Sequence, residues 1–132
     1  MVFDFEKYTK PQAITGITTT ETMITTKPET VQKVVDALQE AMNLLHTNSD
    51  VPLRVATKLF PDMKKSILRA AIARMSAKNM YPESIAVNDE YWQRSIQTRL
   101  ASGDLKKPQA TDVTVDNSFA LKAYQDVGAA KK

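Results

Sequence analysis

The chain has 132 residues, enough for one domain with a single hydrophobic core, and its 42% hydrophobic and 25% charged residues exclude wholesale disorder. Cysteine is absent, which excludes a disulfide framework, a thiolate metal site and a cysteine nucleophile, and the one histidine, His46, leaves little room for a histidine-based metal site. The net charge of +3 is too small to indicate nucleic acid or a membrane by itself, so the composition predicts a soluble protein that is not an enzyme.

The first ten residues do not resemble a targeting segment. They carry acidic residues early and lack the apolar run that precedes a signal-peptide cleavage site. Nowhere do 18 apolar residues follow one another, so the sequence predicts neither a signal peptide nor a membrane-spanning helix in this chain.

The first predicted element is a strand over residues 12–19. The first 30 residues are rich in threonine, and β-branched residues suit a pleated strand. Residues 20–25 could continue this strand or form a helical turn around Met23 and Ile24, and the sequence leaves both open. Because a lone strand has nothing to pair with, it suggests that the chain is part of something larger.

The clearest element is a helix that begins at Pro28. Thr26, Pro28 and Glu29 have the form of a helix start, with threonine as the cap and proline in the first turn. Polar residues, among them Gln39, are expected on the solvent side. Apolar residues recur at the spacing of one helical face, namely Val31, Val34, Val35, Leu38, Met42 and Leu45.

Two shorter helices are predicted on either side of Pro61. A turn at residues 46–50 precedes the first, which begins near Val51 and must stop by Phe60 because proline follows. The second begins at Pro61 and continues to about Lys78.

The last third of the chain predicts two more helices. Asn88 caps a helix that carries Trp92 and ends at Gly103. A polar linker over residues 106–111 follows, and Asp116 is expected to cap a final helix that Gly128 ends.

Few residue groups suggest chemistry. His46 has only Asp50 near it, and a metal site needs three or four converging ligands, so a helix-end or surface role is preferred. Asp89 and Glu90, together with Glu83, could indicate acid–base catalysis. The helix dipole stabilises acidic residues in the first turn after an asparagine cap, so we interpret Asp89 and Glu90 as structural.

Two further groups suggest ligands. Tyr91, Trp92 and Arg94 could stack on a planar ligand, although Trp92 is interpreted as a core residue from its spacing. The two helices around Pro61 could imitate a helix-turn-helix. Their basic residues do not form one stripe, since positions five apart differ by about 140° around a helix, so DNA binding is a minor alternative. These residues are Arg54, Lys58, Lys64, Lys65, Arg69, Arg74 and Lys78.

An ordered set of motifs runs from about residue 13 to residue 124. It comprises Ile14-Thr15-Gly16-Ile17-Thr18-Thr19, Met23-Ile24, the run from Lys27-Pro28-Glu29 to Ala37-Leu38, the Trp92 helix ending Ser102-Gly103-Asp104-Leu105-Lys106, and Val115-Asp116-Asn117-Ser118-Phe119-Ala120. In this order the motifs resemble the last third of the substrate-binding proteins of ABC importers, closest to the nitrate, sulfonate, taurine and pyrimidine-precursor group.

The resemblance implies a fold that is mostly α with a minor β element (α+β). Residues 1–132 would form a single partial domain, the C-terminal helical portion of a two-lobed periplasmic-binding-protein-like α/β fold whose N-terminal lobe is absent. Residues 12–19 would be a hinge-proximal strand and residues 28–127 the helical portion. The implied location is periplasmic or extracellular.

The implied function is the substrate-binding component of an ABC importer, or a truncated C-terminal fragment of one. The solute would be a sulfonate, nitrate or pyrimidine precursor, bound weakly or not at all by this chain alone. Gln12 and Thr15 are the expected ligand-binding residues, with no catalytic residue, metal ligand or cofactor.

The resemblance further implies an ABC permease as partner, and exposed strand and helix faces suggest a homo-oligomer, with no nucleic acid expected. The alternatives are a helical protein–protein interaction module without a small-molecule ligand and, less favoured, a helix-turn-helix-like DNA binder.

Overall fold

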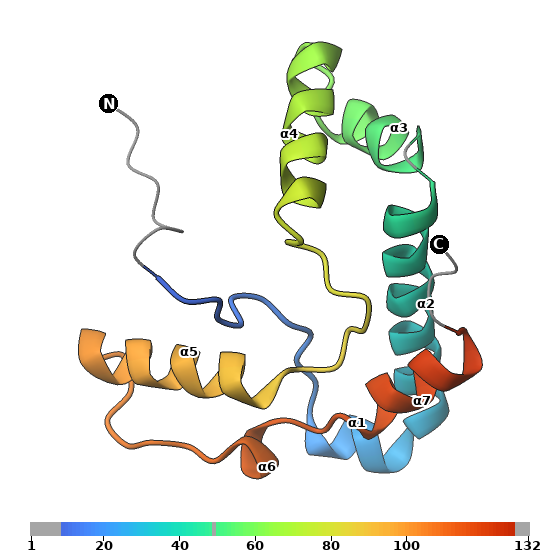
Figure 1. Cartoon of the computed structure of the whole chain (residues 1–132). Helices are drawn as coiled ribbons and strands as arrows, with labels where there is room; N and C mark the ends of the chain where they lie inside the picture. The colour runs from blue at the N-terminus through green and yellow to red at the C-terminus, as the bar shows by residue number, and fades with distance from the viewer. Residues whose placement is uncertain (1–8, 49, 129–132) are drawn as a thin grey trace.

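The computed structural model describes residues 9–48 and 50–128, and within these ranges the chain is all-helical, with 64% helix and no strand. Figure 1 shows the longest helix, α2, as the spine, with α1 and α7 beside its first half and α3 and α4 beyond its end. The helices are α1 (Glu21–Thr26), α2 (Pro28–Thr47), α3 (Asp50–Leu59), α4 (Lys65–Ala77), α5 (Asp89–Ser102), α6 (Thr111–Thr114) and α7 (Ser118–Asp126).

The predicted strand at residues 12–19 is wrong, and with it the α+β class and the two-lobed α/β architecture for the described residues. This segment has no regular secondary structure and pairs with no strand among the described residues. It lies along α5 instead, where the backbone N–H of Ala13 donates to the carbonyl of Tyr91 at 3.1 Å. The β-branched composition suits a strand, but a strand also needs a neighbour to share its hydrogen bonds, and none is present among the described residues.

Residues 20–25, which the sequence left open, form the helical turn. The Thr20 hydroxyl caps α1 by accepting from the backbone N–H of Met23 at 3.2 Å. Thr26 does not cap α2 as predicted, because its hydroxyl donates to the Thr22 carbonyl inside α1 at 2.6 Å. Lys27 occupies the cap position without a side-chain hydrogen bond, and Pro28 is the first residue of α2.

The prediction of two helices around Pro61 is confirmed, but the second begins later than expected. A turn separates α3 from α4, and in it the N–H of Met63 donates to the Phe60 carbonyl at 3.1 Å. Proline pre-sets the backbone of the second position of such a turn, so Pro61 ends one helix without starting the next.

Helix α5 begins and ends as predicted. The Asn88 side chain accepts from the N–H of Tyr91 at 3.0 Å, and Gly103 adopts the left-handed conformation with φ of 82°. Asp116 lies two residues before α7 rather than at its cap, and its carboxylate accepts from the N–H of Ser118 at 2.9 Å. The short α6 was not predicted, since four residues are too few to show a helical period.

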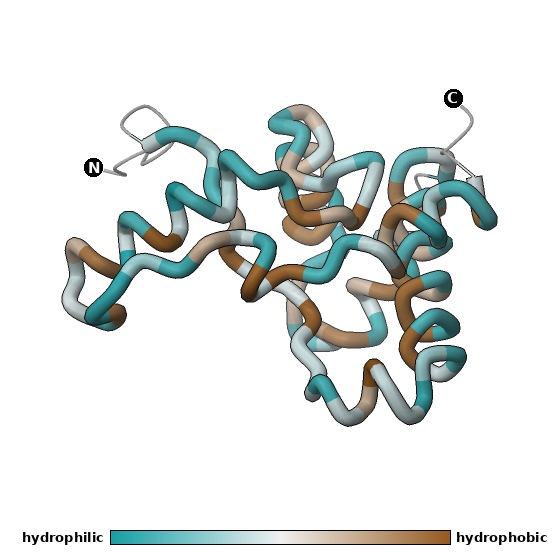
Figure 2. Tube along the Cα trace, turned by 90° about the horizontal axis from the view of Figure 1, so that it is seen from below, coloured by the Kyte–Doolittle hydropathy of each residue, from teal (hydrophilic) through white to brown (hydrophobic). Residues whose placement is uncertain are grey.

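The buried core of the described residues is small. Figure 2 shows apolar segments distributed along the whole trace rather than gathered at one centre. The buried apolar residues are Leu53, Leu68, Ile96, Ala120 and Ala123. Two of these are alanines on α7, which permit close packing against α2, and many larger apolar side chains stay exposed. Among the described helices, none combines the length and the apolar character that crossing a bilayer requires.

Candidate functional site

Gln12 and Thr15, the two predicted ligand-binding residues, lie on the irregular segment of residues 11–20 that runs beside α5. Gln12 is half-buried, and its side-chain oxygen accepts from the Thr98 hydroxyl at 3.0 Å. Thr15 is exposed. The structure brings Gln12 onto the surface of α5, and neither Gln12 nor Thr15 lines either of the two hollows beside α3 and α4.

Polar side chains of α5 hold the segment of residues 11–20 in place. Arg94 donates from its guanidinium to the Pro11 carbonyl at 2.7 Å, and the Ser95 hydroxyl donates to the carbonyl of Ala13. Ser95 is itself buried, next to the core residue Ile96. Backbone and side-chain bonds thus hold residues 11–13 in one register along α5.

The three residues predicted to stack on a planar ligand are engaged within the chain. The Trp92 indole donates to the hydroxyl of Thr114 at 3.1 Å and so ties α5 to α6. Arg94 lies 5.6 Å from the centre of the Tyr91 ring and also pairs with Glu90. Trp92 is half-buried and is not among the buried core residues, which differs from its interpretation as a core residue.

His46 and the acidic residues of α5 also have structural partners. His46 is exposed in the last turn of α2, with its Nε2 3.2 Å from the carbonyl of Pro82. Asp89 and Glu90 lie in the first turn of α5, after the Asn88 cap. Among the described residues no group of three or more histidine, aspartate or glutamate side chains could hold a metal ion.

Two side-chain amides that were not predicted from the sequence, those of the buried Gln39 and the half-buried Asn117, hold the loop before α5. Gln39 is fully buried; it donates to the Glu83 carbonyl at 2.8 Å and to the Asn43 side chain at 3.0 Å, and it accepts from the N–H of Ile85 at 3.2 Å. Its assignment to the solvent side of α2 was therefore wrong. Its position four residues after Val35 puts it on the apolar face and could have indicated burial.

The side chain of Asn117 also binds the backbone of the loop before α5. Its side-chain oxygen accepts from the N–H of Val87 at 2.8 Å, and its side-chain nitrogen donates to the carbonyl of Val87 at 2.9 Å. This pair of bonds imitates the pairing of two strands. Together, Gln39 and Asn117 hold residues 83–87 against α2 and the start of α7.

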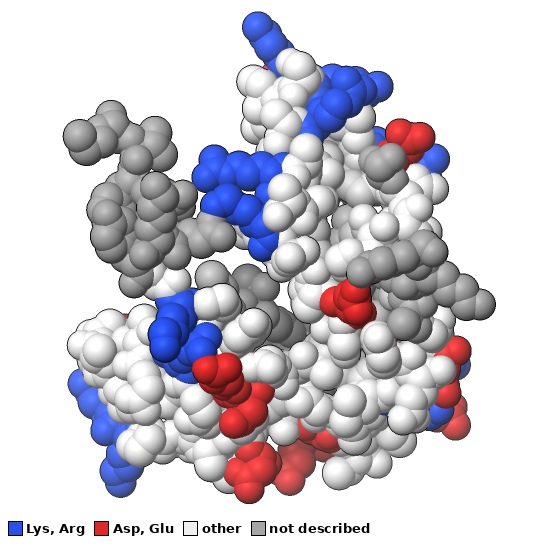
Figure 3. Space-filling model, viewed as in Figure 1, with Lys and Arg blue, Asp and Glu red and all other residues white. Residues whose placement is uncertain are grey.

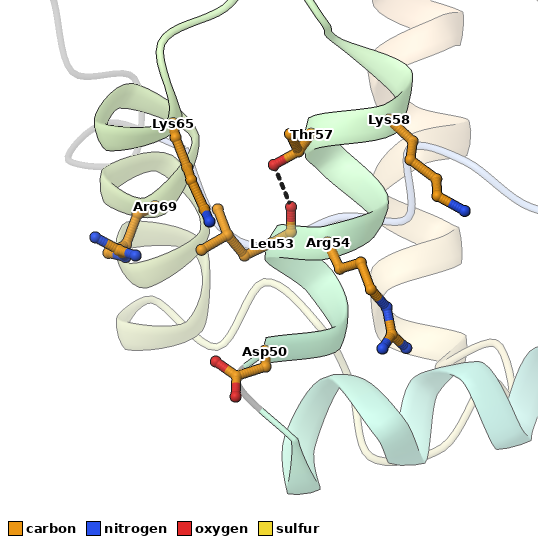
Figure 4. A pocket seen from close by; sticks show the side chains of 7 residues that line it. All are labelled: Asp50, Leu53, Arg54, Thr57, Lys58, Lys65 and Arg69. Carbon is orange, nitrogen blue, oxygen red and sulfur yellow. Dashed lines mark hydrogen bonds between the residues drawn. The ribbon is translucent and has the colours of Figure 1, made fainter.

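A hollow of about 460 Å³ lies between α3 and α4. Figure 4 shows Leu53 and Thr57 at its centre, with basic side chains from both helices at its rims. The basic residues are Arg54, Lys58, Lys65 and Arg69, and the only acidic lining residue is Asp50. Basic residues of two different helices line this hollow, an arrangement that the angular spacing along a single helix does not indicate.

The basic charge is concentrated in this helical pair. Residues 50–78 hold seven basic and two acidic side chains, a net charge of +5, against +3 for the whole chain. Figure 3 shows Lys and Arg over α3 and α4 and again over the α5 end, and several Asp and Glu along the lower edge. The molecule is therefore polarised, although its net charge is small.

The pKa values of two exposed charged groups are shifted by neighbouring residues. The Ser118 hydroxyl, followed by the Ser118 backbone N–H, lowers the pKa of the Asp116 carboxyl from its usual value of 3.8. The hydrogen bond from Lys122 to Asp126 raises the pKa of the Lys122 ammonium. Both pairs stabilise the charged form, and neither lies in a hollow that could hold a substrate.

Comparison with known proteins adds no relative. No protein-family model matches the chain, and no curated protein or solved structure matches it.

Proposed function

We propose that this chain is the helical part of a solute-binding protein that serves an ABC importer, with a sulfonate, nitrate or pyrimidine precursor as the solute. The proposal rests on the ordered motifs between residues 13 and 124 and on one feature of the structure. That feature is an uncharged, exposed apolar surface along the segment of residues 11–20.

Residues 11–20 contain no charged side chain, and Ile14 and Ile17 are among the most exposed apolar residues of the chain. Val34 on α2 is also exposed. Apolar surface of this kind, on a backbone held in place by α5, favours contact with further protein rather than with water. A solute-binding protein supplies such a contact when its other parts cover these residues.

Gln12 is suited to hydrogen-bond an anionic or carbonyl oxygen. The Gln12 side-chain oxygen lies 3.0 Å from the Thr98 hydroxyl, and the Gln12 side-chain nitrogen is a hydrogen-bond donor. A sulfonate or nitrate presents only acceptors, so an amide N–H matches it. Thr15, three residues along the same segment, offers a hydroxyl that can donate to the same class of solute.

The experiment uses the protein encoded by the complete reading frame that contains these residues. A panel of taurine, alkanesulfonates, nitrate and aminopyrimidines is added, and the melting temperature is measured. We expect one solute class to raise Tm, since a ligand at 100 times its Kd stabilises by about 2.7 kcal/mol. The Gln12→Glu variant places a negative charge at the donor position and should lose the shift. No shift with any member of the panel would overturn the proposal.

A helical protein–protein interaction module is the second candidate, and the small buried core favours it. Leu44, Leu59 and Leu121 are exposed on three different helices, so a partner protein could use several faces. This candidate predicts that the chain captures one protein partner in a fixed ratio and that no solute changes its Tm. The solute panel therefore separates the two candidates.

A further inference from the structure

The turn between α3 and α4 carries large apolar side chains at an end of the molecule. Leu59 is 67% exposed, Phe60 53% and Met63 43%. Figure 1 shows α3 and α4 meeting at the upper edge, far from α5, α6 and α7. No described helix covers the turn, so these side chains project from the surface instead of lining a groove.

Backbone hydrogen bonds hold this turn in shape. The N–H of Phe60 donates to the Ala56 carbonyl at 2.9 Å, and the N–H of Met63 donates to the Phe60 carbonyl at 3.1 Å. The N–H of Ile67 then donates to the Lys64 carbonyl at 2.9 Å, which starts α4. The apolar side chains are therefore presented on an ordered backbone, and ordering costs little when a partner binds.

Basic residues flank the apolar residues of the turn in the sequence. Lys58, Lys64 and Lys65 lie within a few residues of Phe60. On α3, Lys58 projects about 60° around the helix from the exposed Val55. On α4, Arg74 projects about 20° from the exposed Ile67. Among the described residues, none of these four basic side chains has an acidic partner.

We propose that the α3–α4 turn docks on an anionic lipid surface. Leu59, Phe60 and Met63 enter the headgroup layer of the bilayer, and Lys58, Lys64 and Lys65 bind the lipid phosphates around them. This inference goes beyond the proposed function and does not depend on it.

Charge and shape together favour a bilayer over the other anionic partners. An exposed apolar turn with lysines on both sides of it in the sequence matches a layer that is apolar inside and anionic at its surface. Duplex DNA offers no apolar layer for Leu59 and Phe60. An acidic protein helix would need a groove, and the exposed apolar side chains lie on a projecting turn. Asp62, also in the turn, opposes binding to an anionic surface, and its removal should therefore strengthen docking.

The experiment is co-sedimentation of the full chain with phospholipid vesicles. Phosphatidylcholine vesicles are compared with vesicles that also hold about 30% phosphatidylglycerol, a common anionic lipid. We expect binding only to the anionic vesicles, and release when salt rises from about 0.05 M to about 0.5 M, because screening lengths then fall well below the size of the turn.

Matched variants assign the binding to the turn. The double variant Leu59→Ser/Phe60→Ser should bind at least about tenfold more weakly, and each of Lys64→Ala and Lys65→Ala about fivefold more weakly. Asp62→Asn should bind more tightly. Leu121→Ser on α7 removes an apolar side chain that is 54% exposed at the far end of the molecule, and it should bind like the parent chain. Circular dichroism checks that each variant keeps its helices.

A second measurement does not depend on apolar substitutions. The chain has no cysteine, so Met63→Cys carries a polarity-sensitive fluorophore at the turn alone, and Lys107→Cys carries it on the α5–α6 loop as the control. Anionic vesicles should shift the emission of the turn label to the blue and leave the control unchanged.

Three results would overturn the proposal. They are the absence of binding to anionic vesicles, equal shifts at both labels, and unchanged binding by the Leu59→Ser/Phe60→Ser variant. Salt-sensitive binding to duplex DNA without vesicle binding would point to nucleic acid instead. Salt-sensitive dimers that the same double variant abolishes, again without vesicle binding, would point to a second copy of this chain.

Discussion

Replacing Gln39 with alanine tests whether one buried amide holds the loop before α5 onto α2. The side chain is 0% exposed and makes three hydrogen bonds, two of them to the backbone of residues 83 and 85. Alanine leaves the half-buried N–H of Ile85 unmatched and removes one bond from the Glu83 carbonyl. An unmatched buried polar group costs about 1–3 kcal/mol. We expect Gln39→Ala to lower the free energy of unfolding by about 2–4 kcal/mol, with the lost packing included.

The assay is urea unfolding followed by helical circular dichroism. Gln97→Ala is the control, because Gln97 is an exposed helical glutamine on α5, and its change should stay within about 0.5 kcal/mol of the parent. Domains of this size have about 5–15 kcal/mol in total, so Gln39→Ala should shift the midpoint strongly or abolish the cooperative transition. Equal midpoints for the two variants would refute the reasoning.

The Gln39→Glu variant tests the same contacts through pH. The new carboxylate can still accept from Ile85, but it cannot donate to the carbonyl of residue 83 unless it is protonated. Burial raises its pKa above the unfolded value of about 4.3, so the folded state binds the proton more tightly. The loss of stability relative to the parent should therefore be smallest below about pH 4 and grow as pH rises. A loss independent of pH would show that the carboxyl has reached water.

Four further outcomes are expected. Asn88→Ala removes the side-chain cap of α5 and should cost about 1 kcal/mol in thermal or urea unfolding, whereas an unchanged Tm would show that the cap is replaced by water. Gly103→Ala places a side chain at φ of 82° and should cost about 1 kcal/mol; a gain in stability would contradict the left-handed cap. Asp116 has a lowered pKa, so its ionised form stabilises above the usual carboxyl value of 3.8, and the difference in Tm between the parent and Asp116→Asn should fade as pH drops below that value. Residues 1–132 alone should bind taurine, alkanesulfonates, nitrate and aminopyrimidines no tighter than about 100 µM by calorimetry, because one short segment supplies too few contacts; a tighter one-to-one isotherm would move the site elsewhere in the chain.

Local patterns in the sequence predicted most of the helices. The apolar period of α2, the proline that ends α3 and the Asn88 cap of α5 each act through neighbours within one or two turns. Such signals do not depend on the tertiary fold, so the helix positions could be predicted. The predicted helix boundaries were wrong at Thr26 and Pro61. Thr26 suits both the end of α1 and the cap of α2, and Pro61 suits both a turn and the first turn of a helix.

The errors have a different physical origin. Whether residues 12–19 form a strand depends on a partner, and here the partner is the side of α5, more than 75 residues away in sequence for the Ala13–Tyr91 bond. The burial of Gln39 depends on backbone groups 44 and 46 residues away. The basic residues of α3 and α4 line one hollow only because the two helices pack together. Features created by contacts distant in sequence carry no local signature.

Two groups of exposed apolar residues differ in the partner that should cover them. Ile14 and Ile17 lie in a segment without any charged side chain, so a protein surface can cover them without desolvating a charge. Leu59 and Phe60 lie among lysines, and a protein that covered them would have to pair or bury those charges. A bilayer leaves the lysines in contact with water at its anionic surface and buries only the apolar side chains. Contact at the uncharged segment should therefore resist salt, whereas contact at the α3–α4 turn should weaken with it, and this contrast separates the two surfaces within one molecule.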